Sequence, residues 1–201
     1  MGEGNHIVGN AFSSYLIVIS GSNAPTLHGN LVGLSVDGTD ITTSRGISFN
    51  TTDNIVIGNL DDNLRNYVAG IDNLAALSIT NGSGIDVVNN YIGAGIVDTH
   101  TVGNNVTGVS TSGITNFTFE GNLIGGSTGQ GLILGGISNV GTIVSNLIGV
   151  EPDGVTAFGN SSYGINITSS TVTATNIGGV GAGNIIANNG SSGIRTAQSS
   201  F

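Results

Sequence analysis

The segments Gly121-Asn122-Leu123-Ile124-Gly125 and Ser145-Asn146-Leu147-Ile148-Gly149 are near copies of each other, and their shared pattern decides the fold. An Asn precedes two aliphatic residues and a small residue. Close or looser copies place the Asn at Asn5, Asn30, Asn66, Asn90, Asn122, Asn146 and Asn184. Successive Asn are 25, 36, 24, 32, 24 and 38 residues apart. These intervals indicate a unit of about 24 residues with insertions at a few loops.

Short alternating runs, such as Ala76-Leu77-Ser78-Ile79 and Gly164-Ile165-Asn166-Ile167, precede these Asn. Alternation directs the aliphatic residues inward and Ser78 and Asn166 toward water. Each unit therefore holds three short strands and three bends. This predicts an all-β fold, a right-handed parallel β-helix (β-solenoid) of about seven coils with three strands per coil. We expect a single domain over residues 1–201, without end caps of its own.

The seven Asn are expected to stack at one corner as a structural ladder. Asn tolerates the left-handed backbone conformation of a bend, and its amide can bond backbone groups of the next coil. A βαβ protein would need amphipathic helical stretches, and none is visible. An antiparallel sandwich would lack the fixed phase of the repeat.

Composition excludes several kinds of partner. Only 7% of the residues are charged, and the only cations apart from His are Arg45, Arg65 and Arg195. Phosphate binding needs clustered positive charge, so no nucleic-acid partner is expected. The net charge of −9 comes from scattered carboxylates and favours a well-solvated surface. The apolar run from Tyr15 to Ile19 is too short to span a membrane.

The stretch from Asn146 to Ile194 resembles the repeats of bacterial right-handed parallel β-helix proteins of the pectate-lyase-like superfamily. The residues that carry this resemblance include Asn146-Leu147-Ile148-Gly149, Asn176-Ile177-Gly178-Gly179 and Gly183-Asn184-Ile185-Ile186. The likeness is fainter over residues 30–145 and weakest before them. It implies secretion or display at the cell surface in a carbohydrate-rich setting. It does not imply a reaction, because this fold carries many functions.

The same resemblance places substrate along the outward face of the first strand of each coil. Those outward positions are Ser48, Ser78, Ser110, Ile133 and Asn166, with Arg195 in the last partial coil. They offer neither a carboxylate pair nor a base beside bound Ca²⁺, as hydrolases and lyases of this superfamily require. We therefore predict no catalytic residues and no lyase or hydrolase activity on acidic polysaccharides. His28 and His100 are interpreted as surface residues.

Four carboxylates are weak candidates for Ca²⁺ ligands, because Asp37 and Asp40 occupy an inserted loop and Glu151 and Asp153 occupy the matching loop of a later coil. A fifth carboxylate, Asp98, lies in a third such loop. Ca²⁺ binds hard oxygens in flexible loops, but Asp-Gly is also ordinary turn chemistry, which is the favoured interpretation. Ca²⁺ is the one cofactor that the sequence suggests.

The sequence favours an extracellular structural β-solenoid that acts as a surface rod, an adhesive spacer or a filament subunit joined end to end, in contact with glycans. One alternative is part of a polysaccharide-active enzyme whose catalytic residues are degenerate or missing. A weaker alternative is an ice- or mineral-binding face, since the outward row is not a regular file of Thr.

Overall fold

The computed structural model describes residues 4–9, 14–35, 45–96, 102–136, 140–168 and 174–196. Within these ranges the regular structure consists of β-strands and one short 3-10 helix, η1 (Asp62–Leu64). Every strand pairing is parallel, so the chain forms an almost entirely β fold built from parallel sheets. The fold agrees with the predicted all-β class.

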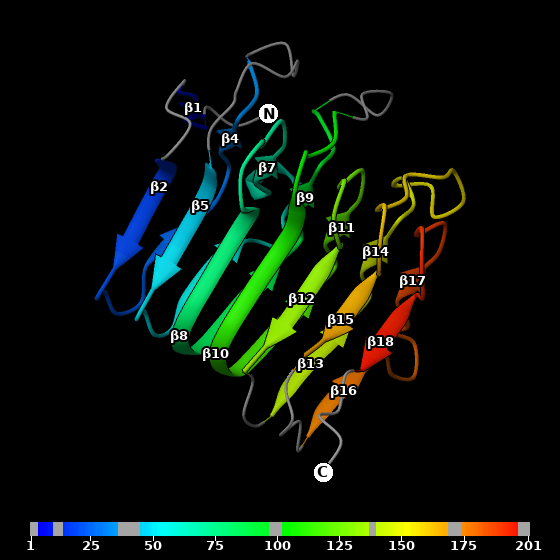
Figure 1. Ribbon diagram of the computed structural model, residues 1–201. Helices are drawn as coiled ribbons and strands as arrows, with labels where there is room; N and C mark the ends of the chain where they lie inside the picture. Colours follow the sequence, from blue (N-terminus) through cyan, green and yellow to red (C-terminus); the bar gives the residue numbers. More distant parts are fainter. Residues whose placement is uncertain are drawn as a thin grey trace.

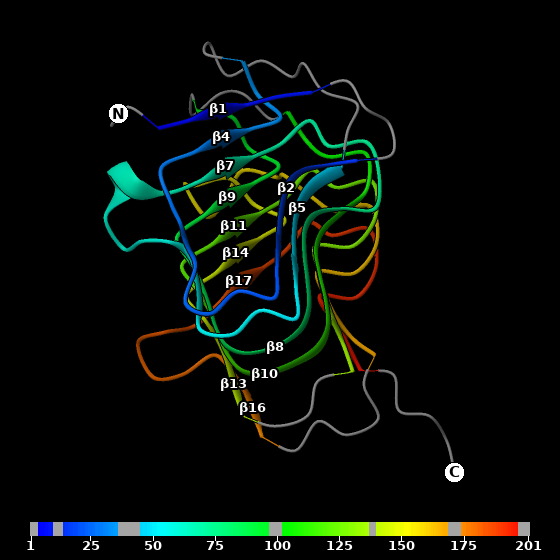
Figure 2. The same cartoon turned by 90° about the vertical axis from the view of Figure 1, so that its left-hand side faces the viewer.

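The strands belong to two sheets (Figures 1 and 2). The smaller sheet contains, in spatial order, β1 (His6–Ile7), β4 (Leu31–Val32), β7 (Tyr67–Val68), β9 (Tyr91–Ile92), β11 (Leu123–Ile124), β14 (Leu147–Ile148) and β17 (Ile185–Ile186). The larger sheet contains β2 (Tyr15–Ser20), β3 (Thr26–Leu27), β5 (Arg45–Asn50), β6 (Ile55–Gly58), β8 (Ala75–Val88), β10 (Thr107–Glu120), β12 (Leu132–Gly135), β13 (Gly141–Val144), β15 (Ile165–Ile167), β16 (Thr175–Ile177) and β18 (Ile194–Thr196).

The chain alternates between the two sheets, and each return adds strands beside those already present. Figure 2 shows the strands of the smaller sheet following one another from β1 to β17. The prediction of three separate short strands fails in two places, because β8 and β10 each run through 14 residues. Both strands still bend, since Asn81 and Gly84 in β8, and Gly113 and Asn116 in β10, have positive φ.

The register places like residues in columns, because parallel strands stack side chain over side chain. Ile47 pairs with Leu77, and Phe49 pairs with Ile79, and all four side chains are buried. Burying one such side chain contributes roughly 1.5–3 kcal/mol. These columns line the inside of the fold and form one continuous apolar core that runs from strand to strand.

In the described ranges, no helix has the length and apolar character needed to cross a membrane.

Candidate functional site

The seven Asn of the repeat form one hydrogen-bonded series, here called the first ladder. It lies at the corner just before the strands of the smaller sheet. The side-chain amide of each Asn donates to the Oδ1 atom of the next, over 2.9–3.1 Å. The ladder runs through Asn5, Asn30, Asn66, Asn90, Asn122, Asn146 and Asn184.

Asn122 illustrates how completely the polar atoms of the first ladder are hydrogen-bonded. Its Nδ2 donates to the backbone oxygen of Val87 and to Oδ1 of Asn146. Its Oδ1 accepts from both the backbone N–H and the Nδ2 of Asn90. The residue is fully buried, where an unpaired amide would cost about 1–3 kcal/mol. The first ladder therefore fixes successive strands to one another.

A second ladder, which the sequence analysis missed, lies at the corner after the smaller sheet. It consists of Asn104, Ser127, Asn160 and Asn189, and all but Asn189 are buried. Asn160 donates its Nδ2 to Oδ1 of Asn189, and Ser127 donates its backbone N–H to Oδ1 of Asn160. A sequence signal exists: each member stands four residues before a Gly, at Gly108, Gly131, Gly164 and Gly193.

The second ladder is broken at Ser127. The Nδ2 atom of Asn104 and the hydroxyl of Ser127 are both buried without a hydrogen-bond partner. Asn104 and Ser127 face each other across a parallel bridge, so an Asn at position 127 would stand where the ladder needs its acceptor. The shorter Ser side chain leaves that acceptor missing.

The outward row of first strands has the predicted register, from Ser48 in β5 to Arg195 in β18, and Val18 in β2 extends it. One expectation about this row is wrong. Asn166 does not face water, because it is only 4% exposed. Its Nδ2 donates to Gln130, its Oδ1 accepts from Arg195, and these neighbouring side chains cover it.

All three arginines of the chain lie over tyrosine rings. The guanidinium carbon is 5.6 Å from the ring centroid for Arg45 and Tyr15, 4.1 Å for Arg65 and Tyr91, and 5.0 Å for Arg195 and Tyr163. Such contacts stabilise by about 0.5–1 kcal/mol at exposed sites. All three arginine side chains therefore pack against aromatic rings.

The acidic candidates fall into two groups. Asp37, Asp40 and Asp98 lie outside the described residues. Glu151 and Asp153 border a described turn, in which Asp153 accepts hydrogen bonds from the hydroxyl of Thr156 and from two backbone N–H groups. These bonds, that of Thr156 foremost, lower the pKa of Asp153. Within the described part of the chain, no group of three or more His, Cys, Asp and Glu side chains could hold a metal ion.

Two of the three histidines can be placed. His6 and His28 are exposed, in agreement with the surface position predicted for His28. His100 lies outside the described residues.

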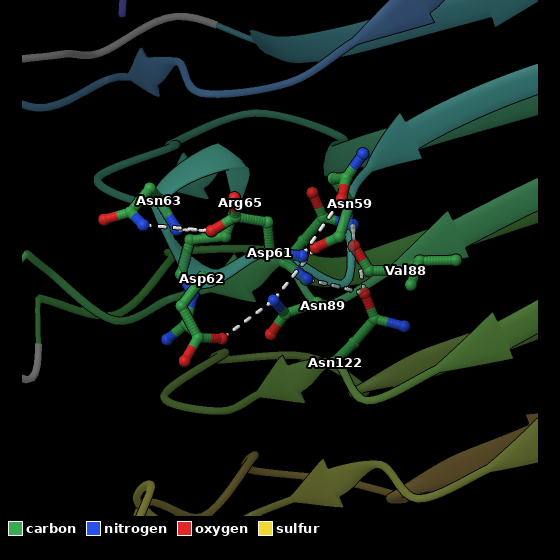
Figure 3. Close-up of polar contacts among 9 residues, drawn as sticks. Asn59, Asp61, Asp62, Asn63, Arg65, Val88, Asn89 and Asn122 are labelled. Atoms are coloured by element: carbon green, nitrogen blue, oxygen red, sulfur yellow. Dashed lines mark hydrogen bonds and ion pairs between the residues drawn. The ribbon is translucent and has the colours of Figure 1, made fainter. Parts of the chain in front are cut away.

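Two corners before the smaller sheet hold long loops rather than compact bends, the one between β6 and β7 (Figure 3) and the one between β16 and β17. Residues 59–65, between β6 and β7, include η1 and are held by their own polar groups. Asp61 accepts from the backbone of Asn63, and Asp62 accepts from Arg65 and from Nδ2 of Asn89. The bond from Asn89, with the bond and charge of Arg65, lowers the pKa of Asp62.

This loop borders an open groove on the outer face of the larger sheet. The groove has a volume of about 350 Å³. Its lining residues are Val56, Gly58, Asn59, Leu60, Asp86, Val88, Thr118 and Glu120. The groove could not be predicted from the sequence, because Asp86 and Glu120 belong to different strands and are far apart in the chain.

Comparison of the chain with protein-family models, with curated proteins and with solved structures finds no match.

Proposed function

We propose that this protein is an extracellular or surface-displayed structural scaffold, a right-handed parallel β-helix of about seven coils that resembles pectate-lyase-like proteins. It acts as a rod, an adhesive spacer or a filament subunit, in contact with glycans. The observation that carries the proposal is the first ladder, whose amides join every strand of the smaller sheet. A stiff rod requires strands that stay stacked on one another along its whole length.

Self-association end to end is part of this proposal. Among the described residues, nothing pairs with the outer edges of β17 and β18, and Ile185 and Ile194 are 43% and 44% exposed there. Unpaired strand edges with apolar neighbours favour pairing with another chain. The first ladder is also directional, because each amide donates toward the next residue in the series. Asn184 of one copy would donate to Asn5 of the following copy, a head-to-tail contact that propagates.

Sedimentation velocity and electron microscopy of the 201-residue chain test this proposal. We expect rods that lengthen as the micromolar concentration rises. Ile194→Asp should shorten them, because a charge would then occupy the contact between copies. Val155→Asp is the matched control, because Val155 is 80% exposed in a loop. Discrete monomers at every concentration, or equal shortening by both variants, would contradict end-to-end association.

We also expect no Ca²⁺-dependent formation of unsaturated sugars from pectate. Arg195, the one cation in the outward row, lies over Tyr163 and donates to Asn166 at 3.3 Å. A lyase needs a base free to take a proton from the sugar. An absorbance assay for unsaturated products checks this, and activity abolished by Arg195→Gln would overturn it.

A further inference from the structure

The groove beside the 59–65 loop lies away from the outward row of first strands. Three parallel strands form its floor, since Val56 of β6 pairs with Asp86 of β8, which pairs with Thr118 of β10. In the next outward column, Gly58 pairs with Val88, which pairs with Glu120. Two carboxylates therefore stand on neighbouring strands of one surface.

The loop gives this part of the sheet a wall that its neighbours lack. The equivalent corners after β8, β10 and β13 contain only two residues each, as in Asn89-Asn90. The 59–65 loop is fixed from several sides, because Arg65 lies over Tyr91 and Asn89 donates to the backbone oxygen of Asn59 at 2.9 Å. A groove with a fixed wall needs little reorganisation to accept a ligand.

The charge of the groove is uncompensated within the described part of the chain. Neither the carboxylate of Asp86 nor that of Glu120 has a hydrogen-bond or ion-pair partner there, whereas Asp62 is occupied by Arg65 and Asn89. Arg65 itself is held against Tyr91. With a net charge of −9, the chain favours cations and ligands rich in hydrogen-bond donors over anions.

The apolar part of the groove lining further limits the class of ligand that the groove can bind. Val56, Leu60 and Val88 offer aliphatic surface, and Leu60 is 70% exposed. A hydrated metal ion would gain nothing from such surface, whereas an organic ring would. The volume of about 350 Å³ is at the lower end of the range for small-molecule sites.

We propose that this groove binds a sugar residue with a free amino group, as in oligomers of glucosamine. The ammonium pairs with one carboxylate, hydroxyl groups donate to the other, and ring carbons contact Val56 and Leu60. This inference names the class of glycan for the contact in the proposed function. It depends on that function only for the glycan-rich setting.

NMR titration of the full chain with a glucosamine tetramer tests the proposal. We expect the tetramer to shift the backbone signals of the groove strands and to bind more weakly as salt rises. Asp86→Asn and Glu120→Gln should each weaken binding at least tenfold. Glu151→Gln removes the same charge in a distant turn and should leave binding unchanged.

Two further probes separate the ligand classes. The N-acetylated tetramer lacks the ammonium and should bind at least tenfold more weakly, and Ca²⁺ alone should not compete. The proposal is overturned if the tetramer does not bind, if Glu151→Gln weakens binding as much as Glu120→Gln, if acetylation has no effect, or if Ca²⁺ displaces the tetramer. Sedimentation tests the scaffold independently, so failure of either proposal can be recognised separately.

Discussion

The first ladder is continuous through seven Asn, whereas the second ladder is interrupted at Ser127. Both lie at corners that flank the smaller sheet, and both use an Asn amide to join successive strands. They differ in how fully their buried polar atoms are hydrogen-bonded. In the first ladder each buried side chain has partners on both sides, while in the second Asn104 and Ser127 each retain a buried polar atom without a partner. One short side chain is enough to interrupt a ladder.

The corners also differ in what surrounds the ladder. The first ladder follows mostly compact bends, and a two-residue strand comes directly after each Asn, in four of the seven cases an aliphatic pair. The second ladder follows the corner that holds loops of varied length, such as the turn at Glu151 to Thr156. Where loops of varied length are inserted at a corner, a side chain in register with those of the neighbouring coils is needed to join one strand to the next.

The largest expected effect comes from breaking the continuous ladder. Asn122→Ala removes four side-chain hydrogen bonds and leaves buried groups of Asn90, Asn146 and Val87 without these partners. We expect the free energy of unfolding to fall by about 3 kcal/mol. Urea denaturation followed by circular dichroism measures this loss. A fall below that of a half-buried control, Thr142→Ala, would contradict the structural role of the ladder.

The matching change in the interrupted ladder should cost less. Asn160→Ala removes two donated bonds, to Ile124 and Asn189, and one accepted from the backbone of Ser127. The expected loss is about 2 kcal/mol, because the side chain of Ser127 does not donate to Asn160. The same urea measurement decides the order. If Asn160→Ala destabilises more than Asn122→Ala, continuity of the ladder is not what matters.

The sequence predicts the first ladder because each Asn is directly followed by its two-residue strand, an aliphatic pair in four of the seven cases, so the motif survives insertions elsewhere. The second ladder is harder to predict, since loops of varied length separate Asn104 and Asn160 from the strands before them. Its signal, a Gly four residues later, marks the start of a first strand instead. Such a signal is visible only after the repeat has been phased.

The burial of a side chain by its neighbours is harder to predict from the sequence than the register of its strand. Alternation correctly puts Asn166 on the outward side of β15, in the row of Ser78 and Ser110. Its burial depends on Gln130 and Arg195, which are 36 and 29 residues away. The groove could not be predicted from the sequence for the same reason, because Asp86 and Glu120 become neighbours only through strand pairing.

Repairing the interrupted ladder should stabilise the protein. Ser127→Asn would give Nδ2 of Asn104 an acceptor and add a donor toward Asn160, so we expect a gain of about 1 kcal/mol in the free energy of unfolding. Urea denaturation measures the gain. Ser127→Ala removes the unpaired hydroxyl without supplying a partner and serves as the control. A gain from Ser127→Ala as large as that from Ser127→Asn would mean that the hydroxyl, and not the missing acceptor, is the defect.

The smallest expected effect concerns a third corner, between the two halves of the larger sheet, where a column of bends replaces a ladder. The strand register aligns five bend residues with φ of +52° to +67°, namely Gly21, Thr51, Asn81, Gly113 and Gly136. Only Thr51 carries a β-branched side chain, which this left-handed conformation disfavours by roughly 1–2 kcal/mol.

Thr51→Gly should therefore raise the free energy of unfolding by roughly 0.5 kcal/mol, because relief of strain exceeds the entropy that Gly loses on folding. The exposed bond from Thr51 Oγ1 to Asn50, at 3.2 Å, offsets little of this gain. Asn81→Gly is the matched control, since Asn already tolerates the conformation and should give no gain. Thermal denaturation of both variants beside the wild type checks the difference. A loss of stability in Thr51→Gly would show that this corner, like the ladders, depends on the side chain itself.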